Sequence, residues 1–506
     1  MTTNKYLTTG IFLLAAFLLL VNLNGLDYWS DEIFSLPKMD TPKVVLAQSS
    51  FDVHPPLFFL AEYYWLQMFG RSETAARSLP AIFGLLGIWA AFLIARRVIP
   101  ENNLKYYLLI LATSPFYLFY ARMARYYSLT GLLTLLSVFF FLKLLEKRKF
   151  GNEIPFWLSS LLLIYTDYIG FIVLLCLGLY YLWSYHKPPK MWIRFIVGGI
   201  ILLILYLPWI SNLFQGAGTG TAPYPADHAA ERESFRLIGF IVYNGIQSVV
   251  RIFYTAYNFT LGENVYPWNP LIGIGIIGAL AVFVKSLRKD EHSPYGFWLF
   301  TLFLPFAVYI LAVVFYSKVF SASNFALLPS KILFLQPLWL MFLLKGDSRK
   351  AVFRVGIVLL LIFQIVSLVN YHRGEQFLNP KYIIPWQMIA SDLETAYNPG
   401  DLMVTDESPL LHYLGKTDVR CYGLAGAAGY AAEQPKPLTV RLVVRHRGEE
   451  SIYLEGIKLK EIFEGEYGPP EYTGYVPMTG LQQKLRSRVQ GRTIEDYVRV
   501  FIFDID

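Results

Sequence analysis

The chain has 506 residues, enough for several soluble domains, but 55% of them are apolar, 17% are aromatic and only 16% carry formal charge. This balance excludes an ordinary soluble protein and is typical of a polytopic membrane protein. The net charge of +7 arises mostly from basic loops beside apolar segments, so it indicates a lipid bilayer as partner and predicts no nucleic-acid partner.

Apolar segments recur along the chain up to Val369 and then stop. A helix of about 20 residues crosses a hydrocarbon core of roughly 30 Å. We therefore predict a polytopic all-α membrane protein with about eleven transmembrane helices and a small C-terminal α+β domain outside the cytoplasm. The expected spans are 7–24, 79–95, 104–120, 128–145, 155–166, 168–185, 193–213, 270–285, 296–316, 330–344 and 352–370.

Every second connection between spans is rich in Lys and Arg, and cytoplasmic loops retain such cations. The amino terminus is therefore expected in the cytoplasm, with everything after Tyr371 outside. We expect a transmembrane catalytic domain over 1–370, with external loops 25–78 and 214–269, and a separate external domain over 371–506.

The first external loop is polar and aromatic at once. Its segments 31–49 and 56–69 are expected to form short helices along the membrane surface, with aromatic side chains at the interface. Two prolines after His54 end one element and can start the next. The loop is therefore expected to hold four ionisable residues near the membrane surface: Asp31, Glu32, Asp52 and His54.

The loop 214–269 begins with a Gly-rich stretch, 216–220, and continues as a helix-like stretch from Glu231 to about Tyr257. A lid over a polar cavity and an ordinary mobile loop are both consistent with this pattern. The tail has helix-like stretches at 385–396 and 480–488, and it predicts strands at Leu402–Val404, Leu438–Val444 and Val498–Phe503.

Cations gather at the external ends of the expected spans: Arg122 and Arg125 lie between spans three and four, and Lys331 opens span ten. Arg offers bidentate hydrogen bonds to a phosphate and Lys a point charge. A carboxylate facing them could remove a proton from an incoming hydroxyl. Group transfer from a lipid phosphate is therefore one interpretation of this constellation.

Each of these residues also has a structural interpretation. Asp31 and Glu32 could serve as a helix N-cap and first-turn acid. His54 could hydrogen-bond a loop, and the two arginines could be interfacial anchors.

Four motifs of the chain resemble those of bacterial membrane glycosyltransferases of the GT-C fold, in particular glycosyltransferase family 39. That family is related to protein O-mannosyltransferases and lipid A aminoarabinose transferases. The resemblance covers roughly residues 7–370. It rests on Asp31-Glu32 after the first span, Asp52-Val53-His54-Pro55-Pro56-Leu57-Phe58-Phe59, Phe69-Gly70-Arg71-Ser72-Glu73 with Arg77-Ser78-Leu79-Pro80, and Ala124-Arg125-Tyr126-Tyr127-Ser128-Leu129.

The resemblance implies inverting transfer of a sugar from a polyprenyl-phosphate donor to a hydroxyl acceptor at the outer face of the bacterial cytoplasmic membrane. The acceptor class stays open among lipid A or core, envelope polysaccharide and protein. Asp31 would be the catalytic base, with Glu32 beside it. The implied substrate-binding residues are Asp52, His54, Arg77, Arg122, Arg125, Tyr126, Asp167 and Lys331.

The chain departs from many members of this family at three places. Met123 stands where relatives have an acid, Lys331 lies in Ser330-Lys331-Ile332-Leu333 instead of an Arg-Tyr-Leu-like sequence, and Asp167 replaces a frequent His. Some relatives use a divalent metal. The residues themselves predict no metal site, because external His are few and no tight ligand spacing occurs.

Two other functions fit a membrane protein with these motifs. A transporter or flippase of a lipid-linked glycan would favour broken spans, ion sites near the midplane and inverted repeats, whereas here the acids lie in an external loop. A membrane anchor for the tail would need far fewer spans.

Overall fold

The computed structural model describes residues 5–36, 41–51, 54–146, 150–184, 189–217, 252–266, 268–286, 295–319, 329–346, 348–415, 419–445, 451–477 and 496–505. The chain forms two compact units. The first comprises Met1–Leu23 and Ser35–Gln376, and the second comprises Asn24–Phe34 and Phe377–Asp506. The first external loop, expected as part of the transmembrane domain, is therefore divided between the units, and the short helix α2 (Ser30–Ser35) runs from one into the other.

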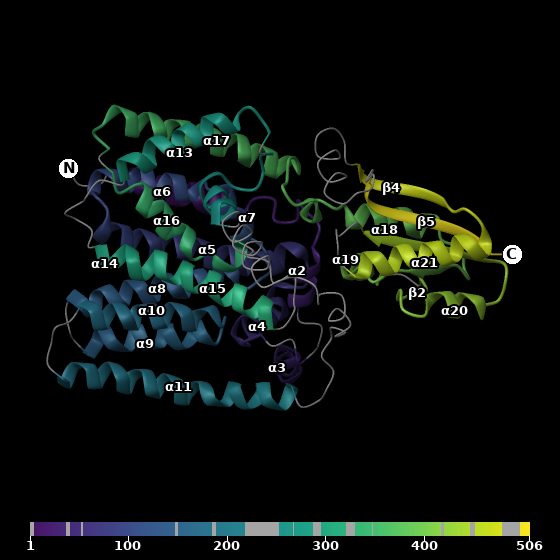
Figure 1. Ribbon diagram of the computed structural model, residues 1–506, viewed down its shortest axis with the longest axis horizontal. Coiled ribbons are helices and arrows are strands. Elements are labelled where there is room, and N and C mark those ends of the chain that lie inside the picture. The colour runs from purple at the N-terminus through teal and green to yellow at the C-terminus, as the bar shows by residue number, and fades with distance from the viewer. Residues whose placement is uncertain are drawn as a thin grey trace, which may run out of the picture. The chain divides into compact units, whose positions relative to one another are not determined.

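The first unit is built almost entirely of helices, which Figure 1 shows at the purple-to-green end of the colour bar. Residues 252–261 are also helical. The elements with their bounds are α1 (Lys5–Leu20), α3 (Pro42–Phe51), α4 (Leu57–Phe69), α5 (Glu73–Val98), η1 (Glu101–Asn103), α6 (Leu104–Ala112), α7 (Pro115–Ala121), α8 (Tyr127–Glu146), α9 (Phe150–Ile164), α10 (Ile169–Ser184), α11 (Pro189–Ala217), α13 (Ile272–Ser286), α14 (Tyr295–Trp298), η3 (Leu299–Phe303), α15 (Leu304–Val319), η4 (Pro329–Ile332), α16 (Leu335–Leu343) and α17 (Ala351–Arg373).

Five helical segments within the described residues are long and apolar enough to cross a membrane. They are Glu73–Val98, Tyr127–Glu146, Ile193–Asn212, Tyr295–Ala312 and Ala351–Arg373. Three shorter helices, α1, α10 and α13, are also apolar. Each of the eleven expected spans overlaps helical residues. The number of membrane crossings and their orientation stay predictions.

The expected third span, 104–120, is not one continuous helix. It breaks at Thr113 and Ser114 into α6 and α7. The hydroxyl of Ser114 accepts a hydrogen bond from the Tyr117 N–H at 3.4 Å, and Pro115 occupies the first turn of α7. Proline has no N–H to donate and suits the first turn of a helix, so this Ser-Pro pair starts a new helix inside the apolar run.

Helices α13 and α17 approach each other closely through glycines. A Cβ atom built on Gly278 would lie 2.9 Å from the Gly356 carbonyl oxygen, and one built on Gly356 would lie 2.9 Å from the Gly278 carbonyl oxygen. Small residues let helix backbones approach in this way, which favours packing where burial of apolar surface from water is weak. The pair therefore fixes the contact between these two helices.

The second unit contains a five-stranded mixed sheet with the order β2-β1-β3-β5-β4. Strand β1 (Leu402–Val404) lies parallel to β2 (Cys421–Tyr422) and β3 (Leu438–Arg445), whereas β5 (Asp496–Ile505) lies antiparallel to β3 and to β4 (Glu471–Pro477). Strands β1, β3 and β5 confirm the three strands predicted from the tail. The helices are η5 (Pro380–Tyr382), α18 (Trp386–Thr395), α19 (Ser408–Leu414), α20 (Ala427–Ala432) and α21 (Ser451–Tyr467).

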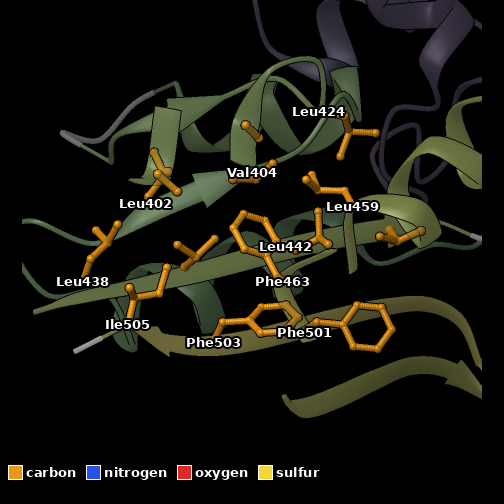
Figure 2. Close-up of a cluster of buried hydrophobic side chains, with 14 residues drawn as sticks. Leu402, Val404, Leu424, Leu438, Leu442, Leu459, Phe463, Phe501, Phe503 and Ile505 are labelled. Atoms are coloured by element: carbon orange, nitrogen blue, oxygen red, sulfur yellow. The ribbon is translucent and has the colours of Figure 1, made fainter. Parts of the chain in front are cut away.

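One face of this sheet packs on α20 and α21. Alternate residues of β3, from Leu438 to Val444, point into an apolar cluster with Phe463 of α21 and Phe501 and Phe503 of β5 (Figure 2). Successive side chains of a strand point to opposite faces, so Arg441 and Arg445 lie on the other face of β3. Helix α18 confirms the helix predicted at 385–396. The stretch predicted at 480–488 and most of loop 214–269, including residues 218–251, lie outside the described residues.

Candidate functional site

Arg125 lies in the buried turn between α7 and α8, among residues that have almost no exposed surface. Its side chain is 7% exposed, and Nη1 donates a hydrogen bond of 2.6 Å to the hydroxyl of Ser35. Its guanidinium lies over the rings of Tyr126 and Tyr127, 4.9 and 5.6 Å from their centroids. A guanidinium held between aromatic faces is a preorganised cation suited to a phosphate.

Asp167 lies in the turn between α9 and α10. Its Oδ1 accepts a hydrogen bond of 3.1 Å from the Ile169 N–H, and Oδ2 accepts a longer one, 3.5 Å, from Thr130 of α8. Burial raises the pKa of Asp167 to about 6. The Ile169 N–H and then the positive charges of Lys331 and Arg125 act in the opposite direction on that pKa.

Lys331 belongs to the short helix η4. Its positive charge lowers the pKa of Asp167, as that of Arg125 does. The chain just after Lys331 passes close to α8, because a Cβ built on Gly131 would meet the Phe334 Cα at 4.0 Å. Thr130, the neighbour of Gly131, is the residue that donates to Asp167. Arg125, Asp167 and Lys331 therefore form one group of interacting charges in the first unit.

His54 and Tyr126 join this cluster from the first loop and the α7–α8 turn. The two rings lie 5.7 Å apart between centroids. The first residue of α4, Leu57, donates a backbone hydrogen bond of 3.0 Å to the Tyr165 carbonyl in the turn that also holds Asp167. The half-buried His54 is thereby held beside the cluster formed by Arg125, Asp167 and Lys331. Asp52 lies outside the described residues.

The two acids of the first motif occupy the first turn of α2. Glu32 is 1% exposed, and its Oε2 accepts a hydrogen bond of 3.4 Å from the Trp29 N–H. This is the backbone contact that an acid in the first turn of a helix makes in a capping box. Glu32 therefore acts as the first-turn acid of α2. Asp31 is half-buried. Ser35, which accepts the hydrogen bond from Arg125, follows Asp31 by four residues in the same helix.

Two of the predicted substrate-binding residues are engaged with the protein backbone. Arg122 is 3% exposed and donates to three carbonyl oxygens at the end of α1, those of Leu18, Val21 and Asn22. Arg77 donates to the Leu23 carbonyl at 2.9 Å and lies 3.9 Å from Glu73. Cations at a helix C-terminus satisfy carbonyl groups that the helix leaves unpaired. These contacts give both arginines a structural role at the end of α1.

Several further residues of this region could not be recognised from the sequence. Thr130 and Ser35 contact the charged groups directly, but a lone hydroxyl residue in an apolar or polar stretch carries no signal of its own. Glu263 is a further buried carboxylate at 3% exposure, and it accepts hydrogen bonds from the Tyr120 hydroxyl at 2.8 Å and the Asn258 amide at 3.1 Å. An acid just after an apolar helix, between Gly262 and Asn264, was the available clue.

Among the residues that the structure describes, no group of three or more His, Cys, Asp or Glu side chains is placed to hold a metal ion. The divalent metal that the resemblance allows therefore finds no ligand set in this part of the chain.

Comparison with known proteins gives structural matches only. No family model matches the chain, and no curated protein matches it. Among solved structures, the chain is similar to ArnT from Cupriavidus metallidurans bound to undecaprenyl phosphate, with 14% identity, coverage of 99% of this chain and 98% of that chain, and a TM-score of 0.42. It is also similar to the oligosaccharyltransferase of Archaeoglobus fulgidus in the apo form, with 12% identity, coverage of 93% and 74%, and a TM-score of 0.47.

A third similar structure is the arabinofuranosyltransferase AftD from Mycobacteria, with 14% identity, coverage of 100% of this chain and 42% of that chain, and a TM-score of 0.42. At such identities and TM-scores the likeness carries no conclusion about activity, and the residues of this chain must support any function.

Proposed function

We propose that the chain is an inverting glycosyltransferase that moves a sugar from a polyprenyl-phosphate donor to a hydroxyl acceptor at the outer face of the cytoplasmic membrane. The observation that carries the proposal is the buried Arg125, held over two tyrosine rings and bonded to Ser35. Asp31, the proposed base, lies in the first turn of α2.

The proposed reaction is a single displacement. Asp31 accepts the proton of the acceptor hydroxyl, whose oxygen forms a bond to the anomeric carbon of the sugar. The bond from that carbon to the phosphate oxygen breaks, and the departing polyprenyl phosphate takes the electron pair. Arg125 and Lys331 stabilise the charge that develops on the phosphate. Attack opposite the leaving group inverts the anomeric configuration.

The remaining residues of the cluster support the two cations and the donor. Asp167 interacts electrostatically with Lys331 and Arg125, and it is proposed to bind the donor together with them. The rings of His54 and Tyr126 are proposed to line the sugar pocket, because an aromatic face packs well against a sugar ring. Arg122 and Arg77 are proposed to hold the backbone at the end of α1 in place and not to contact the substrate.

The test is mass spectrometry of prenyl-phosphate sugars and envelope glycans in cells with and without the gene. Loss of the gene should leave the donor accumulated and one acceptor under-modified. Complementation with Asp31→Asn should fail, whereas Glu101→Gln, at an exposed position in η1, should restore the modification. A flippase of a lipid-linked glycan would instead keep its activity in Asp31→Asn, and that result would overturn the proposal.

A further inference from the structure

Four consecutive residues before the acids of α2 are held by the C-terminal part of the second unit. The Asp27 carboxylate accepts a hydrogen bond of 2.8 Å from the Gln387 N–H, and the Tyr28 N–H donates one of 2.9 Å to the Tyr413 hydroxyl. The Trp29 ring lies 5.1 Å from the Tyr382 ring, with Lys381 Nζ 4.1 Å from its centroid. The Ser30 hydroxyl accepts from Arg445 at 3.3 Å.

The contact of Asp27 completes a helix of the tail. Pro385 at the N-cap of α18 has no side-chain hydrogen bond, so the first N–H groups of that helix need an acceptor from elsewhere. Asp27 supplies it at Gln387, and its negative charge lies at the positive end of the helix. A residue 360 positions earlier therefore caps α18.

The contact of Arg445 rests on a buried ion pair. Arg445 and Glu407 lie 2.9 Å apart, with side chains 5% and 3% exposed, and the same guanidinium nitrogen reaches Ser30. Arg445 also lies 5.9 Å from the Trp386 ring centroid. A buried guanidinium stays with its paired carboxylate, because breaking the pair would leave an uncompensated charge in the protein interior. The start of α2 is thus attached to a fixed point on β3.

We infer that the tail is a positioning device for the acid pair: Arg445 and Asp27 fix the first turn of α2 and so orient Asp31. This inference rests on the proposed role of Asp31 as the base. A base must lie within hydrogen-bond reach of the proton that it accepts. A misplacement of about 1 Å can cost on the order of a hundredfold in rate, so holding four residues in a row just before the base has a direct catalytic consequence.

The chain offers a matched control on the same strand. Arg441 lies four residues before Arg445 on the same face of β3 and forms an equally buried ion pair with Asp401, with side chains 7% and 8% exposed. Its second partner is the Ala396 carbonyl, not a residue of 24–34. Arg441→Met and Arg445→Met therefore remove comparable buried cations, and only the second removes a contact with α2.

The experiment compares the full-length variants by hydrogen exchange and by sugar transfer. Both variants should melt at lower temperature. Only Arg445→Met should speed exchange of the amides of 27–34, by tenfold or more, and lower kcat by about tenfold to a hundredfold with the KM for donor unchanged. Asp27→Ala should act in the same direction, and Asp27→Asn should restore both readouts, because an amide oxygen can still accept from Gln387.

Two results would overturn the inference. One is unchanged exchange of 27–34 in both Arg445→Met and Asp27→Ala. The other is faster exchange with a kcat equal to that of Arg441→Met. Failure of the proposed function has a different signature: Asp31→Asn would keep full sugar transfer, while the exchange of 27–34 would still report whether the tail holds this segment.

Discussion

The raised pKa of Asp167 makes stability depend on pH in a defined direction. Its pKa in the folded protein is about 6, against an ordinary value of 3.8, because burial disfavours the charged form. The folded state therefore binds the proton more tightly than the unfolded state. The stabilisation is fully present below pH 3.8 and is lost as pH rises through 6. Above pH 6, the folded state holds the ionised Asp167 carboxylate in a buried environment, which costs stability.

Asp167→Asn removes that cost. A shift of about two pKa units corresponds to at most about 3 kcal/mol, and the partial exposure of the side chain reduces this value. We expect the variant to match the wild type near pH 4 and to be more stable by 1–3 kcal/mol, an order-of-magnitude figure, at pH 7.5. The amide also keeps an oxygen that can accept from the Ile169 N–H.

Thermal unfolding of the purified protein in detergent, measured from pH 4 to pH 8, tests this expectation. Glu101→Gln, at an exposed position, controls for the loss of one negative charge. If Asp167→Asn were less stable than the wild type at pH 7.5, the attractions of the carboxylate to Lys331 and Arg125 would outweigh the cost of its burial, contrary to this prediction. A difference that did not change with pH would refute it as well.

Three further predictions concern the first unit. Arg122→Ala loses two short hydrogen bonds to carbonyls at the end of α1 and should destabilise the protein by about 3–6 kcal/mol, at roughly 1.5–3 kcal/mol for each charged bond. An unchanged melting temperature would contradict this role. Gly278→Leu should separate α13 from α17 and prevent stable folding. Gly273→Ala has open space around the Cβ position, so it should leave the stability unchanged or raise it by up to about 1 kcal/mol. The melting temperatures of the two variants test this difference. Arg125→Lys should lower the initial rate of sugar transfer on the order of a hundredfold if the guanidinium stabilises the departing phosphate, and a wild-type rate would exclude that role.

Periodicity and composition predicted where helices and strands occur in this chain better than they predicted the breaks within a helical segment. The strands at 402–404, 438–444 and 498–503 were visible because β-branched and aromatic residues gather there between turn residues. The break in the third span was missed, although Ser114-Pro115 is a start signal for a helix. Mean hydropathy over a window is little changed by one such pair, so a long apolar run predicts a single helix even where the chain forms two.

The candidate site could be predicted in its residue types but not in its contacts. Asp167 and the cations Arg125 and Lys331 were singled out from sequence, and they interact. The attachment of Asp27 to Gln387 could not be foreseen, because nothing local to either residue specifies a partner 360 positions away. The division of the first loop between two units could not be foreseen either, because it also depends on contacts between residues far apart in the sequence.

Arg122 and Arg125 show where residue type ceases to be informative. They lie three positions apart in one short turn, are both buried, and were assigned the same function from sequence. Their partners differ: Arg122 donates to backbone carbonyls that the end of α1 leaves unpaired, while Arg125 donates to a hydroxyl and faces two rings. An arginine whose donors go to carbonyls of its own fold has less capacity left for a phosphate. The direction of each side chain, which depends on the neighbouring helices, therefore decides which partners each arginine contacts.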